Sequence, residues 1–322
     1  MTDKSIRKSL LALFGEIIDF IKKDFNLPAY IFGFAFIATT LILNYTTHFY
    51  RDLIRPSYFS GDSLWVMPIF YNLIYFAVAI PTLYFRRDYR ILRNPVFFVK
   101  SSFFVTLYGL AVGFFAYNNL SLSSLFAEER FYILMILSQI KCAVFFIIPL
   151  LILKLTIDKK VNGFYGIARH PKHIRAYFML FAFLIPFLIL ISFTPDFLQA
   201  YPQFQPWFYH SVFGMTTWEY TFIYEITYSL DFIMTELLFR GTLIVGMMLI
   251  MGRSAVLPMV AFYCSIHFGK PMAEAISSIF GGYILGALAY QTRHIWGGIM
   301  VHICIALTME IMGFVHYYIL KN

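Results

Sequence analysis

The stretch MTELLFRG, residues 234–241, decides how this chain folds, because it places two charges inside an apolar run. Its carboxylate, Glu236, and its guanidinium, Arg240, are four residues apart and therefore lie on the same face of a helix. A charged side chain at the centre of a bilayer costs roughly 2.5–3.5 kcal/mol on insertion scales, so such residues face a bundle interior or a cavity. The spacing allows the two groups to neutralise each other.

The whole chain has the composition of a membrane protein. Its 322 residues are 60% hydrophobic and only 13% charged, and the mean hydropathy is +0.71. Soluble domains carry nearer a quarter of charged residues. Apolar runs long enough to cross the bilayer begin near residues 28, 64, 101, 131, 176, 220, 256, 272 and 295. We therefore predict an all-α, polytopic helical bundle of about eight or nine transmembrane helices.

The first residues predict an amphipathic helix and not a cleaved signal peptide. Apolar residues repeat at helical spacing from position 6 to position 25, and basic residues flank them. This pattern is typical of a helix that lies in the membrane interface. We accordingly divide the chain into a cytoplasmic N-terminal helix (1–27), N-terminal transmembrane helices with an interfacial loop (28–218), and a C-terminal helical core (219–322).

Basic residues predict the orientation in the membrane. With the N-terminus in the cytoplasm, most of the 25 Lys and Arg residues fall in cytoplasmic segments, which is the positive-inside bias. The basic residues that fall outside are Arg51, Arg55, Arg130, Lys270 and Lys321. The net charge of +8 thus belongs to loops at the membrane surface. We expect a multi-pass integral protein whose partner is the lipid bilayer, with no nucleic acid.

Polar residues on the run that carries Glu236 favour a cavity over lipid. Asp231 and Thr235 lie one turn apart on a second polar stripe of that helix. The next apolar run ends with His267, one turn after Tyr263. A purely structural ion pair between Glu236 and the arginine four residues later remains an open interpretation.

The last apolar run carries His302 and, two turns later, Glu310. One glutamate and two histidines together could activate water, with the carboxylate as general base and an imidazole stabilising an oxyanion. Glu236, His267 and His302 could instead hold zinc as a His₂Glu set. Their spacing is not that of His-Glu-x-x-His, so we expect no cofactor, and zinc stays an alternative.

The order Glu-x-x-x-Arg-Gly, aromatic-x-x-x-His, then Ile-Trp before a further His resembles the CPBP family of intramembrane endopeptidases. These are the CAAX-processing and bacteriocin-processing (abortive infection) proteases, and the resemblance covers roughly residues 231–313. It implies that the first glutamate of a Glu-Glu pair and the second-motif histidine activate water. It also implies that the last histidine and an asparagine stabilise the oxyanion. The family type implies a bacterial cytoplasmic membrane.

This chain departs from the family motifs at two positions. Thr235 stands where the first glutamate is expected, and Ala306 stands where the asparagine is expected. Glu236 lies about 100° round the helix from Thr235 and is our candidate for the base. We therefore predict the catalytic residues Glu236, His267 and His302. The supporting residues that we predict are Arg240, Thr235, Tyr263, Asp231 and Glu310.

The predicted function is hydrolysis of a peptide bond in a membrane-associated or lipidated peptide by glutamate-activated water. A non-catalytic pseudoprotease or membrane scaffold of the same fold is the alternative, since it explains Thr235 and Ala306 directly. A transporter is less favoured because no inverted repeat is visible. A membrane methyltransferase is also less favoured, because its short resemblance, GFYGIARHPKHIRAY (163–177), is adequately explained as a basic loop.

Overall fold

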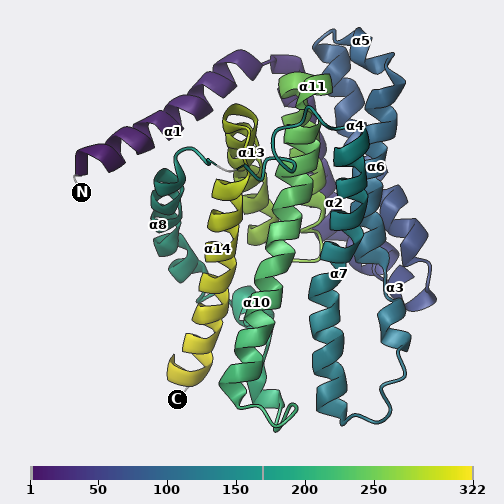
Figure 1. Cartoon of the computed structure of the whole chain (residues 1–322), viewed down its shortest axis with the longest axis vertical. Helices are drawn as coiled ribbons and strands as arrows, with labels where there is room; N and C mark the ends of the chain where they lie inside the picture. The colour runs from purple at the N-terminus through teal and green to yellow at the C-terminus, as the bar shows by residue number, and fades with distance from the viewer. Residues whose placement is uncertain (1–2, 169, 321–322) are drawn as a thin grey trace.

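The computed structural model describes residues 3–168 and 170–320, and these form a bundle of long helices without a strand (Figure 1). The α-helices are α1 (Asp3–Asp24), α2 (Leu27–Thr47), α3 (Ser57–Ser60), α4 (Ser63–Phe85), α5 (Tyr89–Leu92), α6 (Pro95–Gly113), α7 (Ala127–Thr156), α8 (Ile174–Ile191), α9 (Pro195–Ala200), α10 (Thr217–Glu236), α11 (Met248–Met251), α12 (Val256–Ser265), α13 (Met272–Thr292) and α14 (Trp296–Val315). The 3₁₀ and π segments are η1 (Tyr50–Ile54), η2 (Ala116–Asn119), η3 (Pro206–Phe208), η4 (Leu237–Gly246), η5 (Gly252–Ala255) and η6 (His316–Leu320). Lys321, which the sequence places outside, and Arg169, which belongs to the stretch 163–177, lie outside the described residues.

Eight helical stretches of the described chain are long and apolar enough to cross a membrane. This confirms the predicted all-α polytopic bundle. One of the eight, Thr217–Ser265, contains two of the apolar runs that begin separately in the sequence. Gly252 divides this stretch with a φ of 57°, a left-handed conformation that glycine adopts without a steric penalty.

Helix α1 crosses one end of the bundle, where it packs on α13 and α8 (Figure 1). Its buried face carries Leu13 and Phe20, whereas Leu11 and Ile18 are exposed apolar residues. This division suits a helix that lies in the membrane interface. The basic connection around α5 lies at the same end of the bundle as α1 (Figure 1). The side of the membrane to which this end belongs stays a prediction.

An aromatic core joins the N-terminal helices to the C-terminal ones. The ring of Tyr108 on α6 lies 5.2 Å from Tyr71 on α4 and 5.4 Å from Phe239 on η4. Phe239 in turn lies 4.8 Å from Phe262 on α12. The core therefore crosses the boundary that we placed at residue 218. The division of the chain into three segments stays a prediction.

The π-helical segment η4 directly follows α10 and is buried along its ten residues. Glycines at positions 241 and 246 let Tyr165 approach its backbone, since a Cβ at Gly241 would lie 2.8 Å from the Tyr165 carbonyl oxygen. The Tyr165 hydroxyl donates to Asp158 (2.7 Å), which also pairs with Lys100 (2.6 Å). Lys100 donates to the Gly246 carbonyl (2.9 Å). This buried polar cluster holds the wide turn in place, and π segments often mark functional sites.

Helices α4 and α6 pack closely because Gly109 has no side chain. A Cβ at this position would lie 2.5 Å from the Cα of Pro68, which is backbone and cannot yield. We expect Gly109→Ala to destabilise the purified protein by about 1–3 kcal/mol, the usual cost of overpacking. Thermal unfolding in detergent measures this difference.

Gly281→Ala on α13 is the matched control, because nothing lies within 4 Å of a Cβ built there. Alanine is the better helix former, so this variant should be as stable as the parent or more so. Equal unfolding temperatures for the two variants would contradict the close packing of α4 on α6.

Candidate active site

A cavity of about 330 Å³ lies between α8, α10, α12, α13 and α14. It brings together motif positions that are far apart in the chain. Thr235 comes from α10, His267 from the turn after α12, and both His302 and Ala306 from α14. The other predicted site residues that line this cavity are Asp231, Arg240 and Tyr263. We call it the motif cavity.

Glu236 does not line the motif cavity, and its side chain is 0% exposed. Its Oε1 accepts hydrogen bonds from Nη1 of Arg240 (2.8 Å) and from Nδ1 of His302 (3.1 Å). Its Oε2 has no hydrogen-bond partner among the described residues and faces Gly298, where a Cβ would overlap it. Helix α14 thus encloses the carboxylate.

The predicted grouping of Glu236 with His267 and His302 stays a prediction. In the structure Glu236 bonds to His302 but is absent from the lining of the motif cavity, which both histidines line. The physical reason is helical geometry. Neighbouring residues point about 100° apart. Here Thr235 lines the cavity, whereas the Glu236 carboxylate faces Gly298 of α14.

Arg240 is 1% exposed and pairs with Glu236 along the helix, as their spacing suggests. Its guanidinium carbon also lies 4.2 Å from the ring centroid of Tyr263, which is cation–π contact distance. The arginine therefore links α10 and η4 to α12. It reaches the motif cavity with part of its surface.

His267 presents an unprotonated nitrogen. Its Nδ1 lies 2.8 Å from the carbonyl oxygen of Tyr263. A carbonyl oxygen can only accept, so Nδ1 carries the proton and Nε2 keeps its lone pair. The two rings also pack edge to face at 4.9 Å. This arrangement suits a proton acceptor that is held in one orientation.

His302 is held from both sides. Its Nδ1 donates to the Glu236 carboxylate, and its Nε2 lies 3.4 Å from the Tyr263 hydroxyl. Phe232 packs against the ring at 4.6 Å. A carboxylate on one ring nitrogen fixes the imidazole orientation. His302 lines the motif cavity in this fixed orientation.

The predicted zinc ligands do not form a metal centre. No group of three or more His, Cys, Asp or Glu residues in the described part of the chain is arranged to hold a metal ion. A catalytic zinc needs three protein ligands around one point. Glu236 is instead bound to Arg240 and His302, and it lies outside the cavity that His267 lines. These residues do not fit a His₂Glu site.

Glu310 lies apart from the motif cavity. It is buried, and both of its carboxylate oxygens accept from the backbone N–H of Gln203 (2.9 and 3.0 Å). This contact ties the loop before α10 to α14. Asp231, by contrast, does line the cavity, one turn before Thr235. Of these two acidic supporting residues, only Asp231 lines the cavity.

Sequence reasoning missed a polar group at the mouth of the motif cavity. Tyr201 donates to Glu274 (3.1 Å), and Lys270 lies 3.8 Å from the same carboxylate. All three residues line the cavity. Burial, together with the Glu274 charge, raises the pKa of Tyr201 and keeps its hydroxyl protonated. The four-residue spacing of Lys270 and Glu274 was a signal for the charge pair. Nothing local indicated Tyr201.

Residues 217–308 match the family model described as Rce1-like, type II CAAX prenyl endopeptidase. The matched stretch begins with α10 and ends within α14, so it contains all three motifs. This confirms the family resemblance inferred from the motifs, and the match does not extend to the helices before α10. Searches of curated proteins and of solved structures each found no match.

We expect Glu236→Gln to destabilise the purified protein by about 3–5 kcal/mol, because it leaves the buried guanidinium of Arg240 without a counter-charge. Adding Arg240→Gln should restore part of this loss. Unfolding in detergent, followed by tryptophan fluorescence, measures the change.

The control is Asp52→Asn, which removes the carboxylate of the exposed ion pair with Arg51 (2.7 Å). Exposed pairs contribute little, so this variant should unfold like the parent. Parent-like unfolding of Glu236→Gln itself would rule out a stabilising role for the buried pair.

Proposed function

We propose that the protein is an intramembrane endopeptidase that hydrolyses a peptide bond of a membrane-associated or lipidated peptide in the motif cavity. The observation that carries this proposal is that His267 and His302, from two different motifs, line one cavity. The match of residues 217–308 to the Rce1-like endopeptidase family supports it. Other proteins of this family type act on lipidated substrates, which suits a cavity among membrane helices.

In this mechanism His267 takes the role of base, because Glu236 does not reach the cavity. A water molecule beside Nε2 gives its proton to the imidazole, and its oxygen bonds to the carbonyl carbon of the scissile peptide bond. The carbonyl oxygen becomes negatively charged in the tetrahedral intermediate. The imidazolium then returns the proton to the peptide nitrogen as the C–N bond breaks.

His302 and Tyr263 stabilise the negative oxygen of the intermediate. The Glu236 carboxylate orients the His302 ring through its Nδ1, and the Tyr263 hydroxyl lies 3.4 Å from the Nε2 of that ring. His302 and Tyr263 supply the hydrogen bonds that the family asparagine provides, because the side chain of Ala306 at that position cannot donate one. Glu236 thus acts as a positioning residue, with Arg240 holding its other side.

The proposal also includes the cofactor, the partners and the membrane location of the protein. The site works without a metal, the partner is the lipid bilayer, and no nucleic acid is bound. The N-terminus lies in the cytoplasm of a bacterial cell, and the chain crosses its cytoplasmic membrane. The segment 163–177, which resembles part of a methyltransferase, has a structural role, since Tyr165 packs on η4 and the Ile295 N–H donates to Gly166.

A second candidate is a non-catalytic protein that binds a membrane peptide without cleaving it. The observation in its favour is that both altered motif positions, Thr235 and Ala306, face the motif cavity. The cavity therefore lacks a carboxylate and an amide at the places where the family carries them. Such a protein would retain the buried charge pair for stability alone.

We expect His267→Ala to lower hydrolysis at least about 100-fold, the lower end of the contribution of a general base. The assay is cleavage of a membrane-anchored peptide by the purified full-length protein in proteoliposomes, followed by mass spectrometry. His210→Ala is the control, because His210 is exposed and lines no part of the motif cavity. If His267→Ala cleaves at the parent rate, the base is another group.

The double variant Thr235→Glu/Ala306→Asn separates the two candidates. If the parent is a peptidase, it cleaves before any substitution, and the added groups raise its rate. If the parent shows no turnover and only the double variant cleaves, the second candidate is correct. The same proteoliposome assay measures both proteins, and a folded, parent-like unfolding curve is required of the variant.

A further inference from the structure

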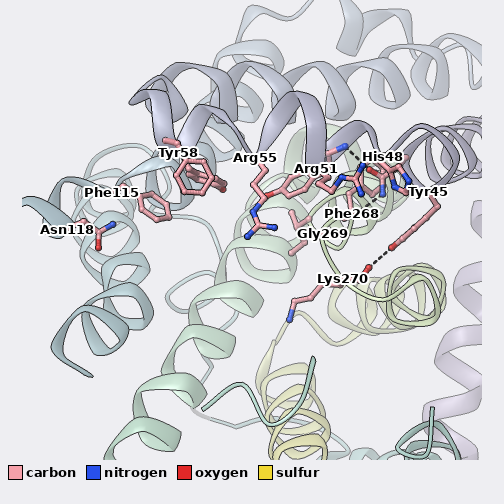
Figure 2. Close-up of a pocket in the computed structure, with 14 residues that line it drawn as sticks. Tyr45, His48, Arg51, Arg55, Tyr58, Phe115, Asn118, Phe268, Gly269 and Lys270 are labelled. Carbon is pink, nitrogen blue, oxygen red and sulfur yellow. Dashed lines mark hydrogen bonds between the residues drawn. The ribbon is translucent and has the colours of Figure 1, made fainter. Parts of the chain in front are cut away.

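Figure 2 shows a second cavity, which has a volume of about 780 Å³. It lies between the C-terminal end of α2, the π segment η1, and the turn of residues 266–270 that connects α12 to α13. Ile266 and Lys270 line both cavities. Their neighbour His267, our proposed base, lies on the same turn. The two cavities therefore share one turn, and our proposed base lies on it.

Hydrogen bonds fix the frame of this second cavity. The side-chain amide of Asn44 donates to the Phe268 carbonyl (2.9 Å), and its oxygen accepts from the Tyr50 N–H (3.1 Å). The Tyr45 hydroxyl donates to the Lys270 carbonyl (2.8 Å), as Figure 2 shows. The turn after α12 is thus bound to the segment after α2. A frame fixed in this way favours binding, because less conformational freedom is lost.

The lining of this cavity is cationic. Its basic residues are His48, Arg51, Arg55 and Lys270, and no carboxylate lines it. Arg51 pairs with Asp52 (2.7 Å), and Lys270 lies 3.8 Å from Glu274. In the described part of the chain, Arg55 has no acidic partner within 4.0 Å. Figure 2 shows Arg55 and Lys270 reaching into the same open space.

These basic residues lie on the side of the membrane where the predicted orientation places few Lys and Arg residues. The predicted orientation leaves few basic residues outside, and Arg51, Arg55 and Lys270 are three of them. Basic residues are normally depleted on that side. Segments more than two hundred residues apart in the sequence bring these three to one cavity. A binding role for an anion explains why they are there.

We propose that this cationic pocket binds a carboxylate-bearing segment of the peptide substrate, next to the bond that is cleaved. The proposal rests on the proposed function, because it assigns a substrate feature to the same site. Arg55 can hold a carboxylate with two parallel hydrogen bonds, and Lys270 supplies a second positive charge. The aromatic pair Tyr58 and Phe115, 4.6 Å apart, offers an apolar wall for the rest of the segment.

A peptide is favoured over a lipid phosphate as the occupant. The pocket shares Ile266 and Lys270 with the motif cavity, so a peptide that occupied both would contact the turn that carries His267. A phospholipid headgroup would have no reason to adjoin the reacting groups. The lipid is therefore one of the outcomes that the experiment tests.

The experiment compares two fluorescent peptides that differ only in Glu-to-Gln replacements, bound to the full-length protein in phosphatidylcholine nanodiscs. We expect the parent to bind the acidic peptide about tenfold more tightly, the value of one charge-assisted hydrogen bond. Arg55→Gln should remove most of this preference, and Arg55→Lys should restore part of it. Arg130→Gln is the matched control, since Arg130 is another outer basic residue but does not line the pocket.

Equal affinity of the parent for the two peptides, or no binding of either, would overturn the proposal. The proposal would also be overturned if phosphatidylglycerol nanodiscs competed with the peptides while the protein in phosphatidylcholine showed no preference for the acidic peptide. That result would show a lipid phosphate in the pocket. Binding and cleavage are read separately. Acid-selective binding without hydrolysis supports the proposed carboxylate pocket and contradicts the proposed peptidase activity. Cleavage of both peptides with equal affinity supports the peptidase activity and contradicts the carboxylate pocket.

Discussion

The buried charge pair of Glu236 and Arg240 is the interaction on which the C-terminal core depends. Neither side chain is accessible to lipid or water to any useful extent, so each charge must be compensated inside the bundle. The carboxylate is also the acceptor for His302 of α14, and the guanidinium lies on the Tyr263 ring of α12. One ion pair within a helix therefore sets how two other helices meet it.

This constraint has a consequence for the chemistry of the site. A carboxylate that is bound to Arg240 and His302 and covered by Gly298 cannot also face the cavity. The cavity side of α10 is left to Thr235. Proton transfer then passes in our proposal to His267, whose bond to a backbone carbonyl leaves a basic nitrogen free. The matched stretch 217–308 thus uses the buried charge pair in its helix packing.

The turn after α12 connects the two cavities of the molecule. It carries His267, contributes Lys270 to both linings, and is bound to the end of α2 through Asn44. A helix of the N-terminal part thus shapes the surroundings of the C-terminal motifs. This contact joins a helix outside the family match to the stretch that the match covers.

The sequence by itself determined the class of the fold, because apolar runs of membrane length and a low charge content leave few alternatives to a helical bundle. It also determined the Glu236–Arg240 pair, since a four-residue spacing is local helix geometry. Only the tertiary structure decided that Thr235, and not Glu236, faces the cavity, because the rotation of α10 is set by its packing on α14. The cationic pocket and the Tyr201–Glu274 contact were likewise invisible, since long-range packing, and no local pattern, brings their residues together.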